Sequence, residues 1–209
     1  MKRLFSVYGD SISTYEGVTP DGWSIFYTGE QREATGVQTP ADTWWMQVIR
    51  ALGGAYLSNI SISGNTICTE GKMGGFPPQR LRQLTAEGKT PDHILLYAGL
   101  NDVMFYIPPA VFQAEYLQLL TNLKQIYPKA QVHCGTLILG EIPGTVNSLR
   151  GIIQRAEPYN AIIRQAVAET DCHLVDLAAL RGRYHALDAF HPNRDGMAQL
   201  AQLWLQAMK

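Results

Sequence analysis

The stretch Leu4-Phe5-Ser6-Val7-Tyr8-Gly9-Asp10-Ser11 sets the pattern for the whole chain, because an apolar run ends abruptly in a turn that contains glycine. Further short apolar runs follow and alternate with segments of helical periodicity, which is the order of β-α-β units. They are Ala55–Ile60, His93–Ala98, Val132–Leu139 and His173–Val175. None alternates strictly between polar and apolar residues, as expected when helices cover both faces of a parallel sheet. The sequence therefore predicts an α/β fold with a mostly parallel sheet of about five strands.

Segments with apolar residues at helical spacing lie between and after these runs. They are Ala41–Leu52, Phe112–Ile126, a helix with Pro158 in its first turn, and a last helix that begins near Asn193. Asn193 is a suitable N-cap, because its side-chain oxygen can accept a hydrogen bond from the first turn of the helix. We find no repeat and no linker, so we expect residues 1–209 to form one domain.

Composition excludes several classes of function. The net charge is −1 and no block of Lys or Arg occurs, so we expect neither nucleic acid nor an anionic membrane surface as a partner. No apolar run approaches the ~18 residues of a membrane span. The charged start leads directly into the first strand without a leader pattern, which favours a cytoplasmic protein. We expect no cofactor, and the sequence does not indicate an oligomeric state.

A metal site is not expected either. The three cysteines are far apart and form no Cys-x-x-Cys pair. His93, His133 and His173 fall at the start of consecutive strands, but no carboxylate pattern accompanies them. We therefore interpret these histidines as structural or solvated residues.

Polar residues gather where strands end. Gly9-Asp10-Ser11 follows the first strand, Ser63-Gly64-Asn65 the second and Gly99-Leu100-Asn101-Asp102 the third, while Asp188-Ala189-Phe190-His191 precedes the last helix. In an open parallel sheet, ligands bind outside the carboxyl ends of the strands. We therefore expect these four segments to meet there.

The residue types in these segments suit acyl transfer. A serine hydroxyl becomes a good nucleophile when a histidine removes its proton, and a carboxylate must orient that histidine. Ser11, His191 and Asp188 can fill these roles in turn. The negative oxygen of the tetrahedral intermediate needs N–H donors, for which the backbone of Ser11, the backbone of Gly64 and the side chain of Asn101 are the candidates.

Together, the four segments resemble the SGNH (GDSL-type) hydrolase superfamily, which is named for Ser, Gly, Asn and His in separate blocks. Ser11, Gly64, Asn101 and His191 occur in that order, and Ile12 replaces the Leu of the GDSL signature. The resemblance implies a three-layer α/β/α, flavodoxin-like fold. It also implies Ser11 as nucleophile, His191 as base, Asp188 as its partner, and the same three oxyanion donors.

The remaining predictions concern the substrate. The segment Thr14–Thr39 is long enough to be a binding loop or lid, and its Trp23, Phe26 and Tyr27 could stack on a sugar or line an acyl site. Glu141 lies in the second irregular segment, Gly140–Arg155, and is a further candidate for substrate binding. We expect a small-molecule ester with a short acyl group, on a carbohydrate-like alcohol.

Several alternatives stay open. A lipase or lysophospholipase and a thioesterase of the same superfamily fit the same blocks. A non-catalytic ligand-binding domain of flavodoxin-like fold would use Ser11 and Asn101 only to hold a ligand. His185 could compete with His191 as the base, although no acid precedes it at the same spacing.

Overall fold

The computed structural model describes residues 2–71, 74–143 and 150–209, and a five-stranded parallel sheet forms its centre. The strand order is β2-β1-β3-β4-β5. The strands are β1 (Leu4–Gly9), β2 (Ala55–Asn59), β3 (His93–Tyr97), β4 (Gln131–Gly135) and β5 (His173–Val175). Every neighbouring pair is parallel. The predicted α/β class and the parallel sheet are therefore confirmed.

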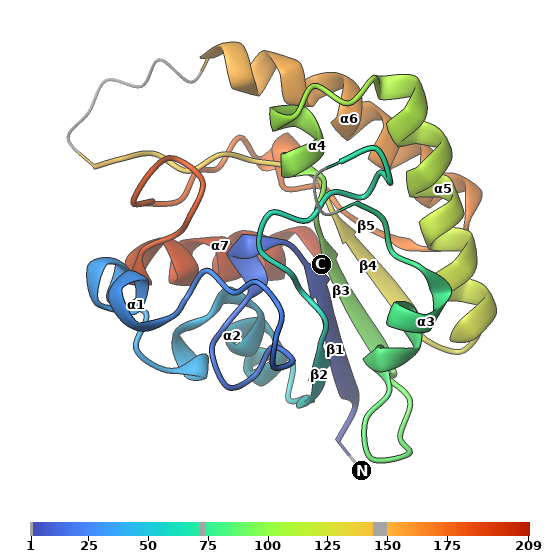
Figure 1. Ribbon diagram of the computed structural model, residues 1–209, viewed down its shortest axis with the longest axis horizontal. Helices are drawn as coiled ribbons and strands as arrows, with labels where there is room; N and C mark the ends of the chain where they lie inside the picture. The colour runs from blue at the N-terminus through green and yellow to red at the C-terminus, as the bar shows by residue number, and fades with distance from the viewer. Residues whose placement is uncertain (1, 72–73, 144–149) are drawn as a thin grey trace.

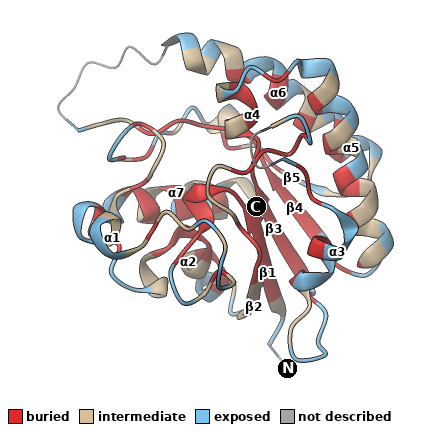
Figure 2. Cartoon of the chain, viewed as in Figure 1, coloured by how far each residue is buried: buried red, intermediate tan, exposed pale blue. Residues whose placement is uncertain are grey.

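Helices cover both faces of this sheet (Figure 1). One face carries α2 (Trp44–Ala51) and α7 (Arg194–Ala207), and the other carries α5 (Pro109–Ile126) and α6 (Arg150–Glu169). Shorter helices are α1 (Gly29–Thr35), α3 (Pro78–Leu81) and α4 (Leu100–Met104). Each face has its own apolar core, and Figure 2 shows β1, β3 and β4 largely buried between the two. Within the described residues, no helix is long and apolar enough to cross a membrane.

The prediction for the helix around Pro158 was wrong about where it begins. Helix α6 begins at Arg150, so Pro158 lies inside it rather than in its first turn. Proline removes one backbone hydrogen bond and disfavours a helix interior. The helix continues because tertiary packing outweighs this cost, since Ala156, Tyr159 and Ile163 are buried in the core on that face of the sheet.

Two other boundaries differ for local reasons. The fourth strand ends at Gly135 instead of Leu139, since the Asn160 side chain takes over both backbone groups of Leu137 at 2.7 and 3.0 Å. The segment predicted as one helix from Ala41 begins with a 3-10 turn, Pro40–Asp42, and α2 starts only after Thr43. The Thr43 side chain caps α2 by accepting the N–H of Met46. In contrast, Asn193 caps α7 as predicted, with Gly196 as its donor.

The strand order indicates where a ligand would bind. The chain passes from β1 to β2 on one side and then returns to β3 on the other side of β1. Such a reversal leaves a crevice at the carboxyl ends of the two neighbouring strands β1 and β3. Ser11 follows β1 directly and Asn101 follows β3, so this crevice lies between them.

The three strand histidines form a row at the opposite part of the sheet. His93 Nδ1 lies 3.0 Å from His133 Nε2, and the rings of His133 and His173 stack with centroids 5.1 Å apart. Burial lowers the pKa of His133 to about 3, and the pKa of His93 is also lowered. Neutral rings of His93 and His133, stacked on each other, fit the structural interpretation of this row.

Candidate active site

Ser11 lies in a tight 3-10 turn, Ser11–Ser13, at the end of β1. Gly9 is required before it, because a Cβ at this position would lie 2.5 Å from the Ser13 hydroxyl and 2.9 Å from the Tyr97 carbonyl. The Asp10 side chain caps the turn by accepting the N–H of Ile12 at 3.1 Å. The turn is thus held rigidly, while Ser11 remains 8% exposed at the crevice.

His191 reaches Ser11 from the turn before α7. The carboxylate oxygen Oδ1 of Asp188 accepts the backbone N–H groups of Phe190 and His191, at 3.0 and 2.9 Å. These bonds close the Asp-x-x-His turn, in which Ala189 has a positive φ of 74°. The turn brings the second carboxylate oxygen, Oδ2, to 2.7 Å from Nδ1 of His191.

The other ring nitrogen, Nε2 of His191, lies 2.9 Å from Oγ of Ser11. A carboxylate can only accept hydrogen bonds, so Nδ1 carries the proton and donates to Asp188. In the neutral ring Nε2 is then free of a proton and accepts the Ser11 hydroxyl. This arrangement can move the serine proton to the imidazole. His191, and not the alternative base His185, makes this contact; the His185 ring lies beside Glu141, with Nε2 and Oε1 4.0 Å apart.

Two carboxyl groups near the imidazole have different environments. Burial tends to raise the pKa of Asp188, but hydrogen bonds from the His191 side chain and backbone outweigh it, so the pKa is lowered. Burial raises the pKa of Asp10 to about 6, against the smaller effect of its bond from Ile12. Asp188 is therefore the negatively charged group beside the imidazole ring, whereas Asp10 stabilises the turn that contains Ser11.

Two of the three candidate oxyanion donors, Gly64 and Asn101, are joined at one segment after β2. Gly64 has a φ of 77°, a conformation that favours glycine, and it precedes Asn65 in the turn. The side-chain Nδ2 of Asn101 donates to the carbonyl of Asn65 at 2.8 Å. An amide NH₂ has two hydrogens, so Asn101 can donate a second bond toward the crevice. Gly64 and Asn101 are in this way tied together through Asn65.

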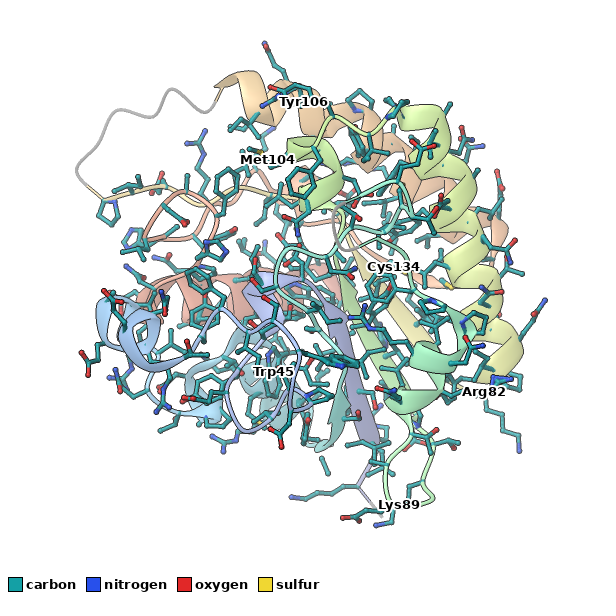
Figure 3. The ribbon with its side chains drawn as sticks, viewed as in Figure 1. Trp45, Arg82, Lys89, Met104, Tyr106 and Cys134 are labelled. Carbon is teal, nitrogen blue, oxygen red and sulfur yellow. The ribbon has the colours of Figure 1, made fainter. Side chains whose placement is uncertain are left out.

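A cavity of about 220 Å³ opens at Ser11. Its polar lining comes from Asp10, Ser11, Asn101 and His191, and the rest is apolar: Ile12, Leu100, Met104, Phe105 and Phe190. Met104 ends α4, and the exposed Tyr106 follows shortly after it at the outer surface (Figure 3). A larger hollow of about 440 Å³ lies between the Ile67–Thr69 segment and α5, but its described lining holds no serine or histidine.

The four residues predicted to bind substrate lie in different places. The ring of Phe26 stacks on the ring of His191, with centroids 3.6 Å apart and planes 7° apart. Tyr27 is fully buried, and its hydroxyl donates to the carbonyl of Pro192 at 2.9 Å. Trp23 lies over the guanidinium of Arg80 at 4.7 Å. Glu141 faces Arg183, with Nη1 and Oε2 3.9 Å apart. The structure thus brings only Phe26 against a residue of the Ser11–His191–Asp188 group.

Sequence reasoning missed the apolar wall of the cavity. Met104 is the last residue of α4, a short helix that starts right after the Gly99 turn, and Phe105 is its C-cap. A stretch of five helical residues gives little periodicity. The spacing of these two residues from Asn101 was the available signal, since residues three and four positions apart share one helix face.

Of the predicted segment Gly140–Arg155, residues 144–149 lie outside the described residues.

The fold and this geometry together define an α/β protein of flavodoxin-like fold, in which a serine, a histidine and an aspartate form one hydrogen-bonded series. Comparison with known families agrees: the GDSL-like lipase/acylhydrolase family model matches residues 7–199. The chain belongs to this family, and it is therefore a carboxylic ester hydrolase. The resemblance to the SGNH superfamily is confirmed, and the alternative of a non-catalytic binding domain is set aside.

Solved structures show the same fold at low sequence identity. A protein described as a GDSL-like lipase from Bacteroides ovatus is 22% identical, with a TM-score of 0.76 over 100% of this chain and 98% of that one. The esterase EstA from a Pseudoalteromonas species is 18% identical, with a TM-score of 0.61 over 98% and 96%. A carbohydrate esterase family 2 enzyme of Corynascus thermopiles is 19% identical, with a TM-score of 0.65 over 100% and 66%. No curated protein matches the chain.

Proposed function

We propose that this chain hydrolyses a small ester with a short acyl group through a covalent acyl-enzyme on Ser11. The observation that carries the proposal is the hydrogen-bonded series Asp188 Oδ2–His191 Nδ1 at 2.7 Å and His191 Nε2–Ser11 Oγ at 2.9 Å. These distances lie within the reach that nucleophile activation by a general base requires.

The proposed reaction has two halves. Ser11 Oγ attacks the ester carbonyl while His191 Nε2 takes its proton, and Asp188 stabilises the charged ring. The Ser11 and Gly64 N–H groups and the Asn101 amide hold the negative oxygen of the intermediate. His191 then gives the proton to the departing alcohol. In the second half, His191 takes a proton from water as its oxygen attacks the acyl carbonyl. The bond between the acyl carbon and Ser11 Oγ then breaks, His191 returns the proton to Oγ, and the carboxylic acid leaves.

The size of the cavity supports a short acyl group. A volume of about 220 Å³ is below the ~300–1,000 Å³ typical of sites for drug-sized ligands. Its apolar wall suits an alkyl chain better than a polar group. The aromatic residues expected to stack on a sugar are engaged elsewhere, since Tyr27 is buried and Trp23 covers Arg80. The proposal therefore specifies the length of the acyl group, and the experiment below includes acetylated sugars to test the alcohol part of the substrate.

The test compares kcat/KM for p-nitrophenyl acetate, butyrate and octanoate, followed by acetylated sugars and an acetyl thioester. We expect the short esters to be preferred, with about a tenfold fall at octanoate because its additional methylene groups find no apolar surface inside the cavity. Met104→Ala, which enlarges the cavity, should move the preference toward longer chains. A wild-type preference for octanoate would contradict the proposed acyl length, and inertness toward every ester would contradict the function.

Replacing Phe26 separates two roles for this ring. We expect Phe26→Leu to lower kcat about two- to tenfold, because a stacked aromatic pair contributes about 0.5–1.5 kcal/mol to holding the imidazole in place. The loss should be equal for acetate and butyrate, and Phe26→Tyr should keep most of the activity. If Phe26 instead binds substrate, KM rises, kcat stays constant, and the effect depends on the ester. Steady-state kinetics of the three proteins decide between these outcomes.

A further inference from the structure

Arg80 is a buried cation that has no role in the mechanism proposed above. It lies in the short helix α3, and only 9% of its surface is exposed. Its Nη1 donates to Oδ1 of Asn65 at 3.0 Å, and its Nη2 donates to the carbonyl of Ile60 at 2.6 Å. The side chain therefore bridges the end of β2 and the turn that contains Gly64.

The surroundings of this guanidinium are apolar. The rings of Trp23 and Phe76 lie over it, with the Arg80 Cζ 4.7 and 4.3 Å from their centroids. Within the described part of the chain it forms no ion pair with a carboxylate, and its Nε has no hydrogen-bond partner. Burial lowers the pKa of Arg80 only to about 10, so it stays charged at neutral pH. Burying an unpaired charge is costly, and a hydrophobic residue of similar size would fill the space at lower cost.

The groups that Arg80 holds are those next to the oxyanion donors. Asn65 follows Gly64 directly, and its carbonyl accepts the Asn101 side chain at 2.8 Å. Both donors are thus attached to one residue, and Arg80 fixes the side chain of that residue. The other end of the same loop is fixed by Asp102, whose carboxylate accepts the N–H groups of Ile67 and Cys68 at 2.9 and 3.0 Å.

The segment before α1 completes this support. The N–H of Ser63 donates to the carbonyl of Ser24 at 2.7 Å, beside the Trp23 that covers Arg80. Two residues further along, Phe26 stacks on His191. The segment of residues 23–26 therefore contacts both the Gly64 turn and the imidazole, and can hold the two in place relative to each other.

We propose that Arg80 is a positioning residue of the oxyanion hole: it holds Asn65 so that the Gly64 N–H and the Asn101 amide point to one oxygen, and its charge favours the oxyanion. This inference rests on the proposed acyl-transfer function. We expect Arg80 to act on kcat rather than KM, because the negative charge on the oxygen develops in the transition state and is absent from the bound ester. A purely structural Arg80 would instead change stability and leave the turnover of folded enzyme unaltered.

The test measures kcat and KM for p-nitrophenyl acetate with Arg80→Gln and Arg80→Lys, well below the melting temperature of each variant. We expect Arg80→Gln to lower kcat about 10- to 100-fold with KM within about twofold, since displaced catalytic donors cost this much. Arg80→Lys keeps the charge but loses the fork geometry, so it should fall in between. The matched control is Arg82→Gln, two residues further along at an exposed position, and it should retain wild-type kcat.

A second variant guards against a misfolded Arg80→Gln. Asn65→Leu removes the Oδ1 acceptor of Arg80 but keeps the backbone carbonyl that Asn101 uses, and it should lower kcat in the same way. The double variant should be no slower than the slower single variant, because both changes break one linkage. Additive losses, or an unchanged kcat with only a lowered melting temperature in either single variant, would overturn the proposal.

Wild type and Ser11→Ala are measured in parallel to keep two failures apart. Activity that depends on Ser11 but not on Arg80 refutes only the positioning role. A wild-type protein that hydrolyses no ester refutes the proposed function, and the role of Arg80 falls with it.

Discussion

Ser11→Ala is expected to lower kcat for p-nitrophenyl acetate by about 10⁵-fold or more, the largest loss of any single substitution in this chain. Alanine removes the oxygen that would form the acyl-enzyme, and no other described hydroxyl is hydrogen-bonded to His191. Water near the remaining donors can still react, which leaves a small residual rate. The melting temperature should change little, because the backbone bonds of the Ser11–Ser13 turn persist.

Covalent labelling gives an independent measurement of the same prediction. A p-nitrophenyl phosphonate should add one phosphonyl group to wild type at Ser11, found by peptide mass spectrometry, and none to Ser11→Ala. Ser58→Ala is the matched control. It removes a hydroxyl on β2 that donates to the Gln83 carbonyl at 2.7 Å, and it should keep full activity. Labelling at another serine, or Ser11→Ala retaining more than about a hundredth of the wild-type kcat, would refute a nucleophilic Ser11.

Much of the fold could be predicted because strand burial leaves a strong local signal. Residues Ile94 to Tyr97 are all buried, and such a run has few interpretations in an α/β pattern. Errors arose where side chains distant in sequence decide the structure. The Asn160 side chain ends the fourth strand early, and packing carries α6 through Pro158. Neither the early end of β4 nor the continuation of α6 through Pro158 can be predicted from the local sequence, because both depend on tertiary contacts.

The candidate site shows the same division. Asp188 and His191 are three residues apart, so a local turn is enough to predict their contact. The 180-residue separation of Ser11 and His191 could be bridged only through topology, by the rule that strand ends share one edge. The stacking of Phe26 and the bridging by Arg80 could not be predicted. Each follows from how a side chain packs across the fold, and aromatic or cationic residues in loops have many possible positions.

The second large effect is expected from Asp188→Asn, which should lower kcat about 10³- to 10⁴-fold while keeping the fold. In wild type, Oδ1 of Asp188 accepts two backbone N–H groups, and Oδ2 accepts the proton of Nδ1. The asparagine side chain has only one oxygen. That oxygen should stay on the two backbone donors, since turning it away would leave both without a partner.

The NH₂ group of the substituted side chain would then face Nδ1 of the imidazole and donate to it. Nδ1 must accept, the ring proton moves to Nε2, and the ring can no longer take the proton of Ser11. Asp195→Asn, at an exposed position in the first turn of α7, is the matched control and should leave kcat unchanged. Phosphonate labelling should still occur at Ser11 in Asp188→Asn, but slowly, because the nucleophile is present and only its base is in the wrong tautomer. A kcat within tenfold of wild type would mean that Asp188 does not orient His191. Loss of both labelling and the folded state would mean that the asparagine oxygen does not keep the two backbone hydrogen bonds, contrary to the conformation expected for this variant.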